Sequence, residues 1–442
     1  MKKLILVLTL IAGIIYLSAN VIYTYKLEAP DIITENNVIK VKMAGAQSYG
    51  NPGAPNLPWF GSKLLLPIGE EAIDIQISLS GAKTFYLDKK VAPIQPPAIL
   101  SKMDKIQKIE ADPEIYNRSD SYPTQKHNGN NTQYLSGHPI NFTAICPFDY
   151  NPMEDKLTFY SQITVTVVTG SSPKANEARR LLKQDVDIAE RLTNTIDNPE
   201  AIPRYEERLV GYDYLIIYDQ LKLTQWLLFK TLYEDRGLNV YMKPIQEIVA
   251  QNAGIDTQEK IRNYIISFYS QQPLKYVLLA GDTDVIPHRG FYVNMGSGGE
   301  VDADIPADMY YSCLDGNWNT DNDNYWGEPM ESDLVPELSI GRFCYNSDDE
   351  IANFINKTSM YLNNPVIPEI KSAFFVGEYL WEGPTWGGDY MDEMIGGSSA
   401  NGYTTVGIPV NWNITTLYDR TYGSSNSWGA SQIRPLLSQG PN

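Results

Sequence analysis

Few residues of this chain could act as a nucleophile and a base. The 442 residues contain three cysteines and three histidines: Cys146, Cys313, Cys344, His127, His138 and His288. A catalytic cysteine needs a base within hydrogen-bond reach and donors for the developing oxyanion. Cys313 lies in an acidic stretch whose carboxylates would raise its pKa, and an odd number of cysteines over this length favours small buried side chains. The residues therefore give little support to a catalytic pair of His288 with Cys313 or Cys344.

The other histidines and the common catalytic motifs add nothing to this pair. His127 and His138 have no acidic or cysteine partner at metal-ligand spacing and are predicted to lie on the surface. The chain contains no Gly-x-Ser-x-Gly, no phosphate-binding loop and no dinucleotide fingerprint. Serine hydrolase and nucleotide chemistry are therefore not supported by motif.

An acidic loop offers a second kind of chemistry, cation binding. Every second residue from Asp315 to Asp323 is Asp or Asn, and Glu328 lies eleven residues after Asn317, the offset at which a calcium loop supplies a bidentate carboxylate. Asn322 stands where such loops usually have glycine, and Asn tolerates the left-handed conformation. The pattern predicts calcium ligands at Asp315, Asn317, Asn319, Asp321, Asp323 and Glu328. A solvated acidic loop is the alternative, and zinc is disfavoured because His288 and Cys313 have no companion ligands.

These residues lie in a stretch that alternates strand and helix patterns. Short apolar runs at 212–218, 238–242, 276–280, 334–343 and 372–378 predict buried strands, and 221–236, 256–269 and 347–362 predict helices. The alternation predicts a parallel sheet with right-handed crossovers, whose ligands lie at the carboxyl ends of the strands. Those ends carry Gly281-Asp282, Gly341-Arg342 and Gly377-Glu378.

The first 170 residues have the pattern of an all-β region. Residues 73–79 and 157–168 alternate apolar and polar side chains, and prolines separate short segments, which predicts an antiparallel sandwich or meander. Residues 117–138 are predicted to form a long exposed loop. The helix-prone stretch at 171–208 is interpreted as a linker or processing region, with Arg204 and Arg208 among the candidate cleavage positions, or as an ordinary connector.

The N-terminus and the net charge bear on location and partners. Lys2 and Lys3 precede an apolar run at 4–17, followed by Ser18-Ala19, which predicts a signal peptide over residues 1–19 and a secreted or cell-surface protein without a membrane span after cleavage. The formal charge of −18 makes nucleic acid an unlikely partner and suits a protein that binds cations.

Several motifs resemble one known family. The runs at 276–282 and 339–343, with Ile286-Pro287 and the pattern from Tyr310 to Trp318, resemble the gingipain-type cysteine peptidases of clan CD, peptidase family C25. The segments 50–58, 65–69 and 149–152 are similar to a gingipain propeptide. Together the resemblance covers almost everything after residue 19.

The resemblance implies a secreted zymogen that hydrolyses proteins or peptides. In this family a β-rich propeptide inhibits a caspase-like α/β catalytic domain that calcium stabilises. Catalysis uses a histidine within Gly-His-Gly and a cysteine at the end of the next core strand, and neither motif is present here. Because residues 433–442 resemble the segment before the histidine strand, the resemblance implies a C-terminally truncated chain with an incomplete sheet. The catalytic pair is expected beyond residue 442, and residues 1–442 alone are expected to be inactive.

Two site residues and a domain division follow from the same resemblance. Glu378 matches an acid that orients the catalytic histidine, and Asp389 falls near the aspartate that selects basic substrate side chains; loop hydrogen bonding or calcium ligation is the alternative for both. The predicted units are a signal peptide at 1–19, a β-rich propeptide at 20–170, a linker at 171–208 and the N-terminal part of the peptidase domain at 209–442. The competing hypothesis is a non-catalytic secreted binding or secretion-apparatus module with a peptidase-like fold.

Overall fold

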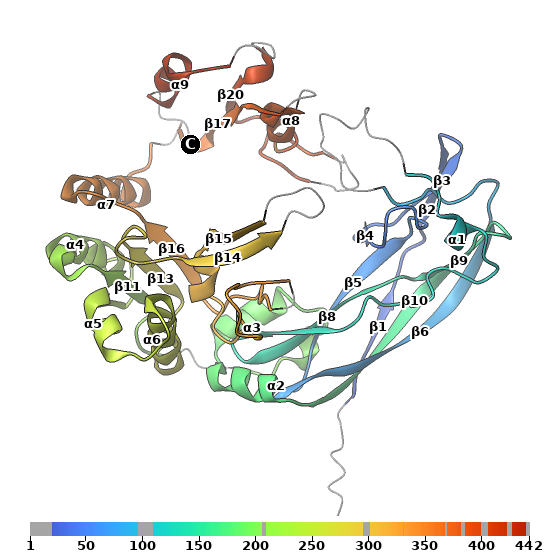
Figure 1. The fold of residues 1–442 in the computed structure, drawn as a ribbon, viewed down its shortest axis with the longest axis horizontal. Coiled ribbons are helices and arrows are strands. Elements are labelled where there is room, and N and C mark those ends of the chain that lie inside the picture. Colours follow the sequence, from blue (N-terminus) through green and yellow to red (C-terminus); the bar gives the residue numbers. More distant parts are fainter. Residues whose placement is uncertain are drawn as a thin grey trace, which may run out of the picture.

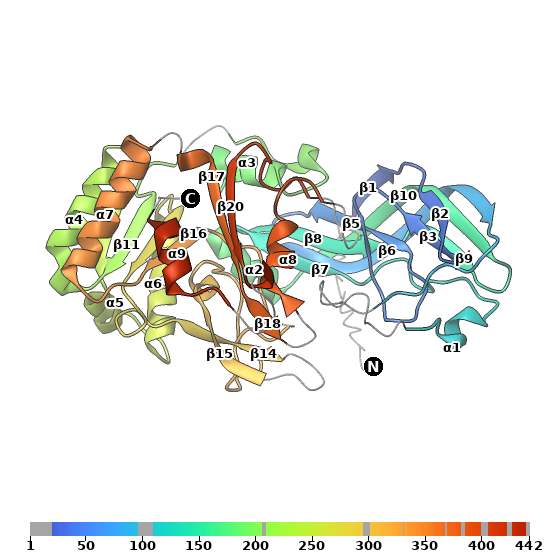
Figure 2. The ribbon, with the colours of Figure 1, turned by 90° about the horizontal axis from the view of Figure 1, so that it is seen from above.

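The computed structural model places an N-terminal β region beside a C-terminal α/β region (Figure 1). It describes residues 20–438, apart from 96–108, 206–208, 295–300, 330, 367–368, 382–384, 399–404 and 422–426. The predicted signal peptide and the candidate cleavage position Arg208 lie outside the described residues. Helices α2 (Pro173–Ala178) and α3 (Val186–Thr193) lie between the two regions in both views (Figures 1 and 2).

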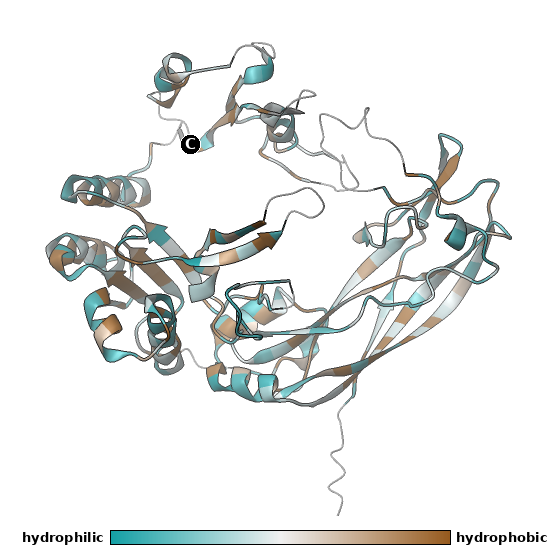
Figure 3. Ribbon diagram, viewed as in Figure 1, coloured by the Kyte–Doolittle hydropathy of each residue, from teal (hydrophilic) through white to brown (hydrophobic). Residues whose placement is uncertain are grey.

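The C-terminal region is built on a parallel four-stranded sheet, as the sequence predicts. Its strands are β11 (Tyr214–Tyr218), β12 (Val240–Pro244), β13 (Tyr276–Ala280) and β16 (Ser339–Phe343), in the order β12-β11-β13-β16. Helices α4 (Leu223–Glu234) and α7 (Asp348–Asn363) cover one face, and α5 (Ile245–Gln251) and α6 (Thr257–Gln271) cover the other. Strands covered on both faces must be apolar throughout, and the two central strands, β11 and β13, are mostly brown in Figure 3.

Side-chain caps fix where the long helices begin. The Asp256 carboxylate accepts a hydrogen bond from the Glu259 N–H at the start of α6, and the Ser347 hydroxyl accepts one from the Glu350 N–H at the start of α7. The Glu350 carboxylate reaches back to the Asn346 N–H rather than to the cap residue itself. The predicted start of both helices is confirmed to within one residue.

The strand predicted at 372–378 is present but is not bonded to this sheet. β17 (Ser372–Gly377) pairs in parallel with β20 (Asn413–Tyr418), and α8 (Gly387–Asp392) packs against β17. This pair lies apart from the four-stranded sheet together with α9 (Ala430–Leu437) (Figure 1). The placement in the main sheet was wrong because an apolar pattern predicts a strand without specifying its neighbour.

Two antiparallel sheets form the N-terminal region. One has the order β1-β10-β6, with β9 also on β10; the other has the order β4-β5-β8-β7. Their bounds are β1 (Asn20–Lys26), β4 (Ala46–Ser48), β5 (Pro58–Leu65), β6 (Glu70–Tyr86), β7 (Asn131–Leu135), β8 (His138–Ile145), β9 (Phe148–Asn151) and β10 (Lys156–Ser171). A separate hairpin joins β2 (Asp31–Glu35) to β3 (Val38–Lys42), and α1 (Pro113–Tyr116) is a single turn. Leu64 of β5, Ile145 of β8 and Val165 of β10 share one core cluster, so the two sheets pack on each other.

The stretch at 117–138 is not a long exposed loop throughout. Its end forms β7 and a two-residue turn, Ser136-Gly137, that leads into β8. His138, predicted to be a surface residue, is fully buried, with its Nε2 2.8 Å from the Tyr205 hydroxyl. A single histidine gives no periodic signal, so its burial depends on which element covers it.

The linker is a packed element rather than an exposed connector. Ile188 and Leu192 of α3 share a buried cluster with Leu65, Leu135 and Ile140 of the N-terminal strands, while Leu181 belongs to the core of the parallel-sheet region. The linker therefore contacts both regions through buried side chains. Among the described residues, no helix is long and apolar enough to cross a membrane.

Candidate functional site

The carboxyl ends of β13 and β16 are fixed to each other by one arginine. Arg342 donates to both oxygens of Asp308 at 2.8 and 2.7 Å, and to the carbonyls of Gly281 at 3.0 Å and Ile286 at 2.6 Å. A planar guanidinium with a bidentate carboxylate partner holds a defined geometry. Arg342 thus ties the turn after β13 to the 3-10 helix η5 (Asp308–Tyr311), where the acidic loop begins.

None of the three cysteines has surroundings that favour a thiolate. Burial raises the pKa of Cys146 to about 12, and burial together with the carboxylates of Asp333 and Glu337 raises the pKa of Cys313 well above its usual range. Cys344 is exposed, contrary to the prediction, but desolvation and the neighbouring Asp282 carboxylate raise its pKa as well. A reactive cysteine requires the opposite environment, a nearby cation or a helix N-terminus.

His288 is engaged by an acid of the β14–β15 hairpin. Its Nε2 lies 3.1 Å from a carboxylate oxygen of Asp304, at the base of β14 (Arg289–Asn294) and β15 (Val301–Ala307). The Nδ1 atom is buried and has no partner. His288 therefore belongs to the contact between the turn after β13 and the β14–β15 hairpin.

The six predicted calcium ligands do not converge on one point. The carboxylates of the loop form two separate groups, each with ligand atoms within 4.8 Å of one another. We call them the inner cluster, formed by Asp315, Asp333 and Glu337, and the outer cluster, formed by Asp321, Glu328 and Glu331. The predicted ligands Asp321 and Glu328 meet in the outer cluster, whereas Asp315 joins two acids that sequence reasoning did not select.

The outer cluster and the predicted residues around it are held by hydrogen bonds within the loop, although Glu331 Oε2 and Asn319 Oδ1 are buried without a partner. Backbone N–H groups two residues on donate to the side chains of Asn317, Asp321 and Asp323, and the Asn319 amide donates to the Asp323 carbonyl at 2.8 Å. Glu331 accepts from both the N–H and the hydroxyl of Thr320 at 2.6 Å. Asn322 has φ +59°, the left-handed conformation predicted for its position. Desolvation and repulsion from Asp323 raise the pKa of Glu328.

The inner cluster is buried and incompletely satisfied. Asp333 and Glu337 are 7% and 2% exposed, and one carboxylate oxygen of Asp333 and one of Asp315 are buried without a partner. Burial and mutual repulsion raise the pKa of Asp315 well above its usual range and that of Glu337 to about 8. Unpartnered anionic oxygens in such surroundings are costly, and a bound cation removes the cost. An all-oxygen donor set fits Ca²⁺ and does not fit zinc, which favours nitrogen and sulfur ligands.

A half-buried arginine fixes the backbone that carries the inner cluster. Arg262 of α6 donates to the carbonyls of Tyr310 at 2.9 Å, Cys313 at 2.8 Å and Gly316 at 2.7 Å. These carbonyls bracket Asp315, so the loop approaches Asp333 and Glu337 in one defined arrangement.

The turn between β7 and β8 reaches the inner cluster from the N-terminal region. We call this turn, Ser136-Gly137, the hairpin tip; its φ angles of +50° and +78° match the type I′ turn of a two-residue hairpin. The Ser136 N–H donates to Glu337 Oε1 at 3.1 Å, and the Tyr269 hydroxyl lies 2.8 Å from the Ser136 hydroxyl oxygen. A Cβ on Gly137 would lie 2.7 Å from the Cα of Leu182. The tip is thus enclosed by α6, the linker and the acidic loop.

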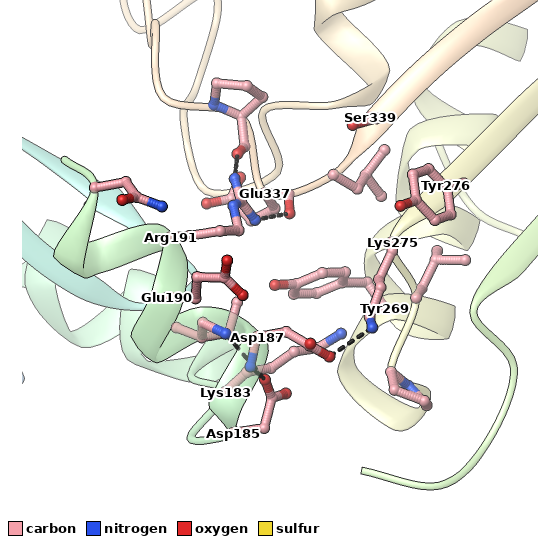
Figure 4. A pocket seen from close by; sticks show the side chains of 16 residues that line it. Lys183, Asp185, Asp187, Glu190, Arg191, Tyr269, Lys275, Tyr276, Glu337 and Ser339 are labelled. Atoms are coloured by element: carbon pink, nitrogen blue, oxygen red, sulfur yellow. Dashed lines mark hydrogen bonds and ion pairs between the residues drawn. The ribbon is translucent and has the colours of Figure 1, made fainter. Parts of the chain in front are cut away.

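A cavity of about 360 Å³ lies beside the hairpin tip, between the linker and the α/β region (Figure 4). Arg191 of α3 donates to the carbonyls of Glu337 and Pro336, both at 2.7 Å, and Asp187 pairs with Lys275 at 2.5 Å. Lys183 donates to the Gln272 carbonyl at 2.8 Å. Burial lowers the Lys183 pKa to about 7. Sequence reasoning missed these residues; the only available signal was the position of Glu337 next to the β16 run.

The two residues carried over by resemblance lie near the end of β17. Glu378 is exposed, and its carbonyl accepts from the Gly387 N–H at 2.8 Å. Asp389, in the first turn of α8, forms an ion pair with Arg420, which also pairs with Asp392. The charge of Asp389 is thus partly neutralised within the protein.

Family models match most of the chain. Residues 208–441 match the model of peptidase family C25, and residues 25–194 match the model of the C25 propeptide. A search of curated proteins found no match.

Among solved structures, the chain is similar to parts of Porphyromonas gingivalis proteins. The complex of RgpB pro- and mature domains is 15% identical, with 42% of this chain and 95% of that chain covered and a TM-score of 0.34. Zymogenic gingipain K is 16% identical, with 35% and 88% covered and a TM-score of 0.29. Dimeric latent PorU is 11% identical, with 83% and 42% covered and a TM-score of 0.26.

Proposed function

The chain belongs to peptidase family C25, and from that premise we propose that it is part of a cysteine endopeptidase zymogen whose N-terminal β region inhibits its own peptidase domain. The observation that carries the proposal is the burial of the hairpin tip, since Ser136 is fully buried between elements of the α/β region and the linker. This buried turn anchors the β region to the peptidase domain, and an intramolecular inhibitor must stay attached in this way. The substrates are proteins or peptides.

The proposal places the catalytic cysteine and histidine outside residues 1–442. It is supported by the raised pKa of all three cysteines and by the engagement of His288 with Asp304. In this proposal Glu378 orients the histidine of a caspase-like domain. Asp389 binds a basic substrate side chain, which requires that Arg420 move away from it.

Calcium is proposed as a structural ion of the acidic loop. The inner cluster fits it best, because Asp315, Asp333 and Glu337 supply only oxygen ligands, the cluster is more deeply buried than the outer one, and two buried oxygens there have no partner. A bound calcium ion would supply positive charge among the three carboxylates. The outer cluster, with Asp321 and Glu328, is a second and more solvated candidate.

Secretion is proposed from the N-terminal sequence. Lys2, Lys3 and the apolar run at 4–17 have the composition of a signal peptide. Cleavage near Arg204, in the exposed end of the linker, would then separate the propeptide from the peptidase.

The test of the inhibitory role uses the full gene product and the variant Gly137→Leu. A side chain at this position clashes with the Leu182 backbone and adopts an unfavourable φ, so the hairpin tip is expected to leave its site. We expect the zymogen to hydrolyse a fluorogenic peptide faster than the wild type, with the activity abolished by thiol alkylation. Ser136→Ala, which removes only the hydroxyl contact with Tyr269, should act in the same direction with a smaller effect.

Three results would contradict the proposal. Unchanged latency in both variants, with circular dichroism showing folded proteins, would exclude the hairpin tip as an inhibitory contact. Turnover by residues 1–442 alone that Cys344→Ala removes would place the nucleophile within this chain, and the absence of thiol-dependent turnover in the wild-type full product after processing would favour a non-catalytic module.

A further inference from the structure

One carboxylate belongs both to the inner cluster and to the contact with the hairpin tip. Glu337 Oε1 accepts the Ser136 N–H at 3.1 Å, while Oε2 accepts the Leu314 N–H at 2.7 Å. The ligand atoms of Asp315 and Asp333 lie within 4.8 Å of Glu337. We propose that binding of a divalent cation at the inner cluster strengthens the contact between the α/β region and the hairpin tip, so that the ion controls how firmly the propeptide is attached to the peptidase domain. This inference rests on the calcium site proposed above.

Without a cation, the three carboxylates of the inner cluster repel one another. Three carboxylates stand close together in a buried place, and Asp333 and Asp315 each direct an unpartnered oxygen into it. Like charges at this distance repel strongly where water is scarce. Movement of the Glu337 carboxylate away from Asp315 and Asp333 lowers this repulsion and lengthens its bond to the Ser136 N–H.

A cation reverses this balance without competing for the same bond. Each carboxylate oxygen has two lone pairs, so Glu337 Oε1 can contact a metal ion and still accept the Ser136 N–H. The ion holds the three carboxylates together and fixes Glu337 where the hairpin tip requires it. The ion and the tip therefore bind the same arrangement of the loop, and each favours the other by linkage.

The same loop also carries the linker contacts. Arg191 of α3 donates to the carbonyls of Pro336 and Glu337, and Figure 4 shows its side chain directed at this segment. A loop ordered by the ion thus offers the linker two carbonyl acceptors in addition to the Glu337 carboxylate for the tip. The coupling reaches two separate parts of the N-terminal half, the turn at Ser136 and helix α3.

The outer cluster provides a matched control in the same loop. Asp321, Glu328 and Glu331 are also three carboxylates, but the hydrogen bonds of Asp321 with Asp323 and of Glu331 with Thr320 stay within the loop. Within the part of the chain that the structure describes, these three residues form no hydrogen bond with the N-terminal region. A cation bound there would not transmit order to the hairpin tip.

Hydrogen exchange measured by mass spectrometry on the 442-residue chain tests the coupling. In 1 mM CaCl₂, compared with EGTA, we expect exchange at least tenfold slower in peptides covering 133–140 and 312–316. Asp333→Asn should abolish the calcium response in both peptides, and Asp321→Asn should preserve it. In EGTA, Asp333→Asn should exchange no faster than the wild type in 133–140, because one repelling charge has gone; this result also shows that the variant is folded.

Three outcomes would overturn the proposal. Calcium that protects 312–316 but leaves 133–140 unchanged would show a metal site without coupling. A response that survives in Asp333→Asn and disappears in Asp321→Asn would move the ion to the outer cluster, and no response at all would remove the ion. The measurement needs no peptidase activity, so failure of the coupling and failure of the proposed function are seen in different experiments.

Discussion

The inner and outer clusters consist of the same residue types in the same loop, yet they are built differently. The outer cluster accepts hydrogen bonds from residues two to eleven positions away within the same loop, so its side chains mainly shape the loop. The inner cluster joins Asp315 to Asp333 and Glu337, about twenty residues away, and Glu337 contacts Ser136, about two hundred residues earlier. The difference shows that burial and distant partners, rather than the spacing of acids, decide which carboxylates can couple an ion to the rest of the protein.

The largest difference between the clusters is expected from removing one carboxylate of each. In calcium, Glu337→Ala leaves two buried N–H groups without an acceptor and should lower the free energy of unfolding by about 2 to 6 kcal/mol, since each such group costs about 1 to 3 kcal/mol. Glu331→Ala, whose partner Thr320 is exposed to water, should change it by less than about 1 kcal/mol. Urea denaturation followed by tryptophan fluorescence measures both, and equal effects would contradict the distinction.

The stabilisation of the folded state by calcium should also depend on the inner cluster and not on the outer one. An ion at 100 times its Kd stabilises the folded state by about 2.7 kcal/mol, which thermal unfolding detects as a rise in Tm. Asp315→Ala should remove this rise, while Asp321→Ala should keep most of it. If isothermal titration shows no heat for the wild type at millimolar calcium, neither cluster is a calcium site.

A smaller effect on stability is expected from pH, through the buried His138 next to the hairpin tip. Burial lowers the pKa of His138 below its ordinary value of about 6.5, so the folded state holds the imidazole neutral. The contribution of His138 to the stability of the fold is fully present above the pKa of this side chain in the unfolded state. It is lost as the pH falls through the pKa of His138 in the folded state. As the pH is lowered below 6.5, the Tm of the wild type should therefore fall more than the Tm of His138→Gln. His127→Gln is the control, and an equal acid response in all three proteins would exclude this role for His138.

The smallest effect concerns the single hydroxyl contact that joins the tip to α6. Tyr269→Phe removes the hydrogen bond with the Ser136 hydroxyl and should cost about 1 kcal/mol. A double-mutant cycle with Ser136→Ala should show a coupling of the same size, because neither change removes the Ser136 N–H that Glu337 accepts. If the effects of the two substitutions on the free energy of unfolding are additive, this contact does not contribute to the attachment of the hairpin tip.

The elements of the fold follow closely from local sequence. The apolar runs of β11 and β13 and the caps at Asp256 and Ser347 are visible without the structure, because their signals depend on residues a few positions apart. The neighbour of β17 was not predictable in this way. A strand pattern is satisfied equally by β16 and by β20, and only the folded chain shows that β20 is the partner.

The candidate site divides along the same line. The sequence alone determined that this stretch carries many oxygen ligands, that Cys313 lies among acids and that Gly281 and Arg342 follow or end buried strands. Only the tertiary structure selected Asp333 and Glu337, buried His138 and brought Ser136 to the loop. The physical reason is that desolvation and orphaned hydrogen-bond groups arise where segments distant in sequence exclude water together, and neither composition nor spacing records which segments will meet.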